Sequence, residues 1–528
     1  MTLKRIILIV LTFVAILFSG SSLIGSLKEP QFQSELELYQ TNIVLLATEW
    51  EPSNGDGEKL QNAKKAILGA KPLDLALKQY QQARTSAETN LAKTQNQLAQ
   101  IASTSTDILP TPNSQSEVPP VTYVSSVVEQ KKLQQTANQI RKMLGELDLQ
   151  IGIIQARQGN SDTAIETWLN LQKNSSINSP FSETSQVLIG LWEKSPYLSE
   201  NAELLIKDNL KGWFRNSALQ KKYQIQQNTE SLNNIKFAEQ QAAEKALIKL
   251  AIIATLPALG GFIGLGLLIF TFGQWIIKRE AALLARNSTL GWKTPWDGET
   301  ILQVFVVGFF LMGQLLVPLF LQLFPIPRPA PNLRIQALYV LISYILVASG
   351  SLLVLYLSIK QFFPLSEDVN WFSFRLRDGW LLWGIGGYCA AIPIVVVVSL
   401  VNQQLWQGQG GSNPLLQIVL ESQDNLALLI FFSTAAIAAP LFEEFLFRGF
   451  LLPSLTRYLP LWGSILFSSF LFAAAHLSLS EILPLTALGI VLGVVYSRSR
   501  NLLAPMLLHS LWNSGTLMSL FILGSSTN

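Results

Sequence analysis

The chain has 528 residues, of which 49% are hydrophobic and 14% are charged. Soluble domains carry about 25% charged residues, so this balance argues against an ordinary cytosolic enzyme and against a disordered chain. The net charge of +3 is too small to indicate nucleic-acid binding. The single cysteine, Cys389, excludes an internal disulfide framework, a Cys-rich zinc module and an iron–sulfur cluster.

Residues 1–27 predict a membrane anchor or signal. Lys4 and Arg5 precede an apolar run from Ile6 to about Ile24. A cleavable signal peptide has the same order of features, but this run is longer than a usual signal core and no clean small-x-small site follows it. These two features favour an anchor that stays on the protein.

Residues 28–247 predict a soluble helical domain. The region is rich in Gln, Asn, Lys and Glu, and its apolar residues recur mostly every three to four positions. Helices are expected at about 57–101 and 125–146. The Ser-, Thr- and Pro-rich stretch from Ser103 to Pro120 is expected to be a linker.

A single tetratricopeptide-like helix pair is predicted within this domain. Gly152, Gly159, Ala164 and Trp168 match the spacing of such a repeat, although clear tandem copies are absent from the sequence. One repeat cannot bury its own face, so neighbouring helices must cover it. Two roles stay open for residues 28–247. The domain is either a docking platform that presents a substrate or partner to the membrane site, or a helical domain that only packs on the membrane core.

The composition changes at about Lys249, and the rest of the chain predicts a polytopic helical membrane protein. A hydrocarbon core of about 30 Å takes about 20 residues to cross. The sequence contains eight further hydrophobic segments, most of them of that length, near 250–277, 301–324, 336–358, 379–401, 425–455, 461–477, 482–497 and 502–523. With the first segment they give an all-α fold of about 8–9 transmembrane helices. We assign residues 248–370 to additional transmembrane helices that precede a core at residues 371–528.

Basic residues predict the orientation, because cytoplasmic loops are enriched in Lys and Arg. Lys4 and Arg5 place the N-terminus in the cytoplasm, and alternate loops then carry most of the other basic residues of the membrane region. Residues 28–247 are therefore expected outside the cytoplasm, in a periplasm or an organelle-type lumen. The sequence leaves open whether this multi-pass protein lies in a plasma membrane or in an internal photosynthetic-type membrane.

Acidic, basic and histidine residues inside the predicted spans are concentrated in the last segments. A charge in the middle of a bilayer costs about 2.5–3.5 kcal/mol on insertion scales, so such residues are candidates for function. The segments 301–324, 336–358 and 379–401 contain none. The later segments contain a polar cluster of Glu443, Glu444, Arg448, His476, His509 and Asn513. Both histidines of the protein belong to it.

The spacing of the first three residues predicts a division of roles. Glu444 and Arg448 are four residues apart with the acid first, which is the favourable order for an ion pair on a helix. Glu443 lies about 100° around that helix and is left for another role. Glu443 and His476 are equally far in sequence from the turn that joins their segments, so they can meet at one level.

These residue types predict amide hydrolysis by water. Glu443 and His476 sharing one water would form a general-base pair. His509 shares a helix face with Asn513, and the two would offer donors to a developing oxyanion. A zinc ion held by His476, His509 and Glu443 is a second possibility, although the sequence has no H-E-x-x-H signature. A third possibility is that the polar cluster has a purely structural role, because buried Glu–Arg and His–Asn pairs also join helices.

Three motifs resemble those of the CPBP family of intramembrane proteases, also called the CAAX protease or Abi family. They are E-E-x-x-x-R at 443–448, F-x-x-x-H at 472–476 and H-x-x-x-N at 509–513. The resemblance covers about residues 375–520, so the core at 371–528 would be the protease domain.

The resemblance implies a conical cavity in an all-helical core, open to a membrane-associated peptide or protein substrate. It implies that Glu443 and His476 activate water and that His509 and Asn513 stabilise the oxyanion. The family is often labelled metalloprotease, but this arrangement suits a metal-independent glutamate mechanism better, in which no cofactor is required; zinc stays open. The supporting residues would be Glu444, Arg448 and Phe472.

Two other functions stay open. The first is a non-catalytic membrane scaffold or maturation factor that uses the same cavity for binding. The second is a transporter with the polar cluster as an ion site. The absence of an inverted repeat in the sequence, and the crowding of polar residues at one end of it, argue against a transporter.

Overall fold

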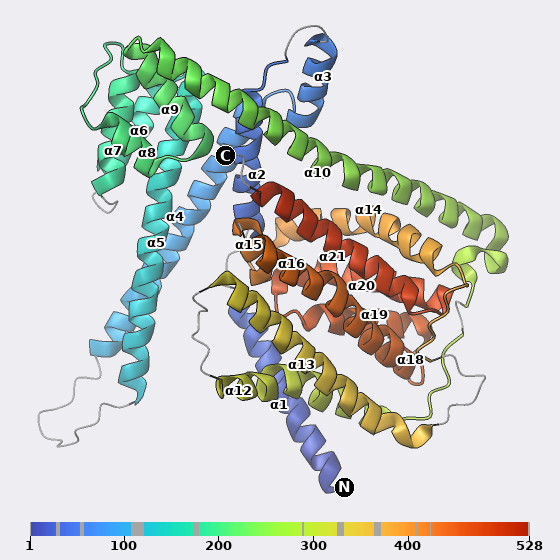
Figure 1. Cartoon of the computed structure of the whole chain (residues 1–528). Coiled ribbons are helices and arrows are strands. Elements are labelled where there is room, and N and C mark those ends of the chain that lie inside the picture. Colours follow the sequence, from blue (N-terminus) through green and yellow to red (C-terminus); the bar gives the residue numbers. More distant parts are fainter. Residues whose placement is uncertain are drawn as a thin grey trace, which may run out of the picture. The chain divides into compact units, whose positions relative to one another are not determined.

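The computed structural model describes residues 2–27, 32–52, 57–106, 121–173, 179–287, 290–324, 332–363, 371–406, 409–422 and 424–525. Within these ranges the regular structure is helical and no β-strand occurs (Figure 1). The predicted all-α fold is therefore confirmed. The chain forms two compact units: a polar unit of residues 34–251, and a membrane unit that combines residues 1–33 with residues 252–526.

The polar unit is an array of helices. They are α2 (Phe32–Thr48), α3 (Gly57–Leu68), α4 (Pro72–Thr106), α5 (Val121–Arg157), α6 (Ser161–Lys173), α7 (Ser179–Trp192), α8 (Ala202–Asn209), α9 (Gly212–Ile225) and the first part of α10 (Thr229–Lys278). The helix expected at about 57–101 is divided in two. The division follows from Gly69, which adopts a left-handed φ of +81°, and from Pro72, which begins the next helix.

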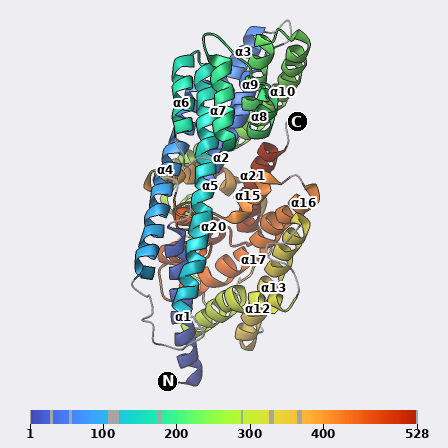
Figure 2. The ribbon, with the colours of Figure 1, turned by 90° about the vertical axis from the view of Figure 1, so that its left-hand side faces the viewer.

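The long helices α4 and α5 lie side by side (Figures 1 and 2). α4 continues to Thr106 and so includes the first residues of the expected linker at 103–120. The rest of that linker lies outside the described residues.

The predicted helix pair is built from α5 and α6. Gly159 takes a φ of +88° in the turn between them. A Cβ atom at Gly152 would lie 2.2 Å from Nε1 of Trp168, so a glycine at this position lets the indole reach α5. Trp168 is fully buried, and its Nε1 donates to the Leu149 carbonyl at 3.2 Å. Trp192 of α7 packs against the same indole at 5.5 Å, which gives the pair the cover that a single repeat needs.

Eight helices of the described chain are long and apolar enough to cross a membrane. They are Leu3–Ser26 (α1), Thr229–Ala281, Gly298–Gln322, Leu333–Phe362, Trp380–Trp406 (α14), Asn425–Leu455, Leu479–Ser499 and Leu503–Gly524 (α21). A ninth apolar helix, α19 (Leu461–Ala474), is shorter. The prediction of a polytopic helical membrane protein with about 8–9 apolar helices is therefore confirmed.

Burial distinguishes the membrane helices from one another. In Asn425–Leu455 and Leu479–Ser499, 44% of the most apolar stretch is buried, against 6% in Leu3–Ser26. Helices with little burial direct their apolar side chains outwards, as lipid-facing helices do. The two more buried helices form the interior of the membrane unit, and the first of them carries the two adjacent glutamates.

His476 lies just beyond the end of its helix, whereas the sequence predicted one hydrophobic segment over 461–477. α19 has 14 residues, or about 21 Å at 1.5 Å per residue, which is less than a hydrocarbon core. Leu477 then adopts a left-handed φ of +56°. The backbone amide of Ser480 donates to the Gly410 carbonyl at 3.1 Å, so the turn that carries His476 is tied to another loop.

Candidate active site

The two adjacent glutamates lie between two irregular turns. The stretch from Asn425 to Leu455 contains α16 (Asn425–Ser433), η5 (Thr434–Ala438), α17 (Ala439–Glu444), η6 (Phe445–Leu451) and α18 (Leu452–Leu455). Of these, η5 and η6 have wider π-helical turns. Such turns are uncommon and are often found at functional sites, because they change the direction in which side chains point. Glu443 and Glu444 end α17, between the two.

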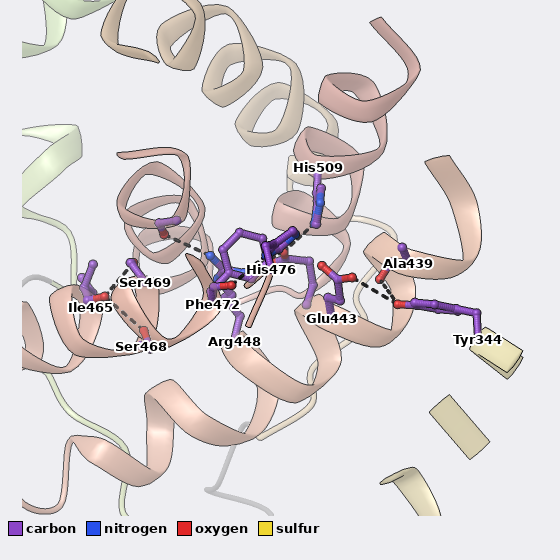
Figure 3. Close-up of polar contacts among 12 residues, drawn as sticks. Tyr344, Ala439, Glu443, Arg448, Ile465, Ser468, Ser469, Phe472, His476 and His509 are labelled. Atoms are coloured by element: carbon purple, nitrogen blue, oxygen red, sulfur yellow. Dashed lines mark hydrogen bonds and ion pairs between the residues drawn. The ribbon is translucent and has the colours of Figure 1, made fainter. Parts of the chain in front are cut away.

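Residues of all three motifs meet in the interior of the membrane unit (Figure 3). Arg448 of η6 lies with its guanidinium carbon 4.5 Å from the centre of the Phe472 ring at the end of α19. The same ring contacts His476 edge-on at 5.1 Å and His509 of α21 edge-on at 5.7 Å. Phe472 is buried and packs against residues of all three motifs.

The interior of the site is a fully buried ionic network. Oε1 of Glu444 accepts from Nη1 of Arg448 at 2.8 Å and lies 2.8 Å from Nδ1 of His509. Nη2 of Arg448 donates to the Gly489 carbonyl at 3.2 Å. Glu444 and Arg448 are 0% exposed and His509 is 3% exposed. The ion pair predicted from the spacing is therefore present, and it also holds the histidine of the third motif.

The hydrogen bond to Glu444 defines the chemistry of His509. An ionised carboxylate only accepts, so Nδ1 of His509 is the donor. Nε2 therefore carries a lone pair and accepts hydrogen bonds when the ring is neutral. It is a donor only when the ring is protonated.

The ring of His476 is fixed in a comparable way. Its Nδ1 lies 2.9 Å from the Phe472 carbonyl, which can only accept, so Nδ1 carries a proton. In the neutral ring Nε2 is therefore left as a lone pair that can take a proton from water. His476 is half-buried, in contrast to His509.

Glu443 is also half-buried, and its partner comes from outside the three motifs. The hydroxyl of Tyr344, in α13 (Leu333–Ile359), donates to Oε1 of Glu443 at 3.2 Å (Figure 3). Among the described side chains, Glu443 and His476 form no direct hydrogen bond with each other.

Asn513 is not bonded to His509, which precedes it by one helical turn. Its amide Nδ2 donates to the Ala435 carbonyl of η5 at 2.7 Å. The amide nitrogen carries two hydrogens, so a second N–H remains for another acceptor.

The structure does not assemble the predicted zinc ligands into a metal site. Among the described residues, no group of three His, Cys, Asp or Glu side chains is placed to hold a metal ion. Nδ1 of His509 is engaged with Glu444, and Oε1 of Glu443 with Tyr344. Since the donor set of His476, His509 and Glu443 does not fit a zinc ion in this arrangement, we derive no step through a metal.

Two residues of the site were not identified from the sequence. Tyr344 lies in an apolar segment. The only feature of the sequence that could have pointed to it is its hydroxyl group, which needs a hydrogen-bond partner inside a membrane. Glu481 ends the short turn η7 (Leu479–Glu481) and immediately precedes α20 (Ile482–Ser499). Its Oε1 accepts from the Asn413 backbone amide at 2.9 Å, and its charge interacts with His476.

Residues 425–515 match the family model of the type II CAAX prenyl endopeptidase Rce1-like proteins. This range contains all seven predicted site residues and is narrower than the predicted 375–520. The resemblance to this membrane protease family is therefore confirmed for that segment.

Two curated relatives match the chain. It is 25% identical over 134 residues to the candidate membrane peptidase YdiL of Bacillus subtilis, which is 25% of this chain and 54% of YdiL. It is 40% identical over 140 residues to an uncharacterised 24.3 kDa protein of Escherichia coli, which is 26% of this chain and 62% of the relative. The chain thus spans little more than half the length of these relatives. No solved structure matches it significantly.

Proposed function

We propose that this integral membrane protein is an intramembrane endopeptidase that hydrolyses peptide bonds in membrane-associated peptides or proteins. One observation carries the proposal: the polar residues divide into two kinds. Glu444, Arg448 and His509 are buried and bonded to one another. The other kind, Glu443 and His476, is half-buried, and no described residue bonds Oε2 of Glu443 or Nε2 of His476. In the first set Glu444 and Arg448 support the site, and the second set is available to react.

The proposed reaction uses water as the nucleophile. A water between Glu443 and His476 transfers a proton to this pair while its oxygen attacks the carbonyl carbon of the peptide bond. The tetrahedral intermediate collapses when the same proton passes to the leaving nitrogen. The products are a carboxylate and an amine, so neither a reductant nor a cofactor is consumed.

His509 and Asn513 are proposed to stabilise the oxyanion of this intermediate. The second N–H of Asn513 is one donor. Because Nδ1 of His509 is bonded to Glu444, Nε2 can be the other donor only when the ring carries both protons.

We also propose that the polar unit lies outside the cytoplasm, as the distribution of basic residues indicates. A cysteine introduced at the exposed position Ser199 should then react with a membrane-impermeant maleimide in intact cells, whereas the native Cys389 is buried. If that cysteine reacts with the maleimide only after the membrane has been permeabilised, the polar unit lies in the cytoplasm and the proposed orientation is wrong.

The polar unit is further proposed to dock substrate or a partner beside its helix pair. A hollow of about 400 Å³ there is lined by Asp74, Leu77, Lys78, Gln81, Gln158 and Asn160. Side chains of both signs and several amides suit a polar peptide better than an acyl chain. A photocrosslinker at Gln81 should capture the proteins whose cleavage depends on Glu443. Equal capture from the exposed position Lys211 would contradict this docking role.

The proposed function is tested with E443Q and H476A in a strain from which the gene has been deleted. Each protein is expressed at the wild-type level, and new N-termini of membrane peptides are compared by mass spectrometry. Glu280 is exposed in the helical turn η1 (Arg279–Ala281) that follows α10, so E280Q is the matched control for the loss of one carboxylate. We expect fragments with wild type and E280Q that fall by roughly 10²- to 10⁴-fold with E443Q and H476A.

The opposite result has a defined meaning. If all four proteins give the same fragments and rescue the same deletion phenotype, the protein is not a protease. The non-catalytic scaffold or maturation factor then becomes the favoured function.

A further inference from the structure

α13 supplies a polar group to the candidate site although it lies outside the Rce1-like range of residues 425–515. The Tyr344 hydroxyl is 3.2 Å from Oε1 of Glu443 and 3.5 Å from the carbonyl of Ala439. The Tyr344 ring packs edge-on against Phe442 at 6.0 Å. The hydroxyl therefore reaches the last turn of α17 from a neighbouring helix (Figure 3).

The direction of this hydrogen bond follows from the chemistry of the two groups. An ionised carboxylate has acceptors only, so the phenol donates. In apolar surroundings neither group can exchange this bond for water without cost. One oxygen of Glu443 is thus held, which fixes the carboxylate plane and leaves the other oxygen for the proposed water.

Other contacts hold α13 in position, so the bond does not depend on Tyr344 alone. Near the start of α13, Nε of Arg334 lies 2.6 Å from Oδ2 of Asp424, the residue that caps α16 through the amides of Leu426 and Ala427. Further along, Ser351 donates to the Gly308 carbonyl at 2.5 Å. The helix that carries Tyr344 is therefore tied both to the glutamate-bearing stretch and to the helix before it.

We propose that Tyr344 is a positioning residue for Glu443, and that the catalytic site of this protein is completed by a helix outside its protease-like segment. The inference rests on the proposed function, since it takes Glu443 to be the general base. A general base must be held within hydrogen-bonding reach of the water that it deprotonates, and small errors in placement cost rate.

Y344F removes the hydroxyl and keeps the ring, so the packing against Phe442 is preserved. Tyr356 lies on the same helix with its side chain exposed, and Y356F is the matched control. The first measurement needs no substrate. Infrared spectra of the full-length protein in proteoliposomes are recorded during an acid titration, and subtraction of the E443Q spectrum assigns the carboxyl band of Glu443.

We expect Y344F to move that carboxyl band to higher wavenumber, because the carboxyl group of Glu443 loses a hydrogen-bond donor. Y356F should leave the band at its wild-type position. The second measurement is the steady-state kinetics of cleavage of the peptide that the fragment comparison identifies. We expect Y344F to lower kcat by roughly 10-fold, with little change in KM.

Two results separate the failure of this inference from the failure of the proposed function. If cleavage depends on Glu443, but Y344F has the wild-type carboxyl band and the wild-type kcat, Tyr344 is not a positioning residue. If no fragment depends on Glu443, the proposed function fails, and with it the catalytic meaning of the bond, whatever the spectra show. Matching thermal unfolding of Y344F and Y356F excludes a folding defect as the cause of a lower rate.

Discussion

An acidic residue followed four residues later by a basic one forms an ion pair in both units of this molecule, but the two pairs differ in their effect on stability. In the polar unit, Oε1 of Glu203 lies 2.7 Å from Nζ of Lys207, four residues later in α8. In the membrane unit, Oε1 of Glu444 lies 2.8 Å from Nη1 of Arg448, again four residues later. The order of the charges, their spacing and their distance are alike, so the sequence predicts both contacts equally well.

Their surroundings differ. The side chains of Glu203 and Lys207 are 36% and 52% exposed, whereas those of Glu444 and Arg448 are 0% exposed. An exposed pair contributes about 0.2–1 kcal/mol, whereas removing one partner of a buried pair costs about 3–5 kcal/mol. The same spacing therefore contributes little to stability at Glu203 and Lys207, whereas at Glu444 and Arg448 burial makes the pair costly to break.

The largest expected effect comes from breaking the buried pair. R448L leaves Glu444 with His509 as its remaining partner in a water-poor interior, and we expect a loss of about 3–5 kcal/mol in stability. Thermal unfolding of the purified protein in detergent measures it. Arg286 is exposed in a loop, so R286L makes the same substitution without this burial. If R448L and R286L unfold at the same temperature, the buried network is not a structural element.

An intermediate effect is expected from packing in the polar unit. G152A places a Cβ atom 2.2 Å from Nε1 of Trp168, and such overpacking costs about 1–3 kcal/mol. Hydrogen exchange of peptides from α5 and α6 should become faster, because the indole must leave its site. A Cβ atom added at Gly57 would have nothing within 4 Å of it, so G57A serves as the control and should leave exchange in these peptides unchanged. If G152A and G57A show equal exchange in these peptides, α5 and α6 do not pack through the close contact between Gly152 and Trp168.

The gathering of these residues was largely predictable because charge is rare in apolar segments. Glu443, Glu444, Arg448 and the two histidines stand out where ionisable groups are costly, and the structure brings residues of all three motifs together around Phe472. Tyr344 was missed, since a neutral tyrosine in an apolar helix is ordinary and its contact with Glu443 depends on packing between helices far apart in sequence.

The fold class was predictable, but two boundaries of helices were not correctly predicted. Gly69 and Pro72 did carry a visible signal for the division of the helix expected at about 57–101. The end of α19 before His476 carried no such signal, because the left-handed residue is Leu477 and its neighbours remain apolar. The sequence therefore predicted that His476 would be near the site, whereas its position in a turn depends on tertiary contacts.

The smallest expected effect comes from the exposed pair, and its pH dependence distinguishes it from the buried one. Hydrogen bonds from Lys207 and Lys222 lower the pKa of Glu203 to about 2, below the value of about 4.3 for an unfolded chain. Because the folded pKa is the lower one, the stabilisation is complete above about pH 5 and is lost as the pH falls towards 2.

K207Q removes the exposed partner alone, because Glu203 keeps the buried Lys222 as its second partner. K207Q should therefore cost far less than R448L at pH 7, since solvent screens a side chain that is 52% exposed. The difference from the wild type should vanish in acid and shrink in high salt. K211Q, at another exposed lysine of the polar unit, should show neither dependence. A loss with K207Q as large as that with R448L, or one that persists at pH 2, would mean that burial is not what separates the two pairs.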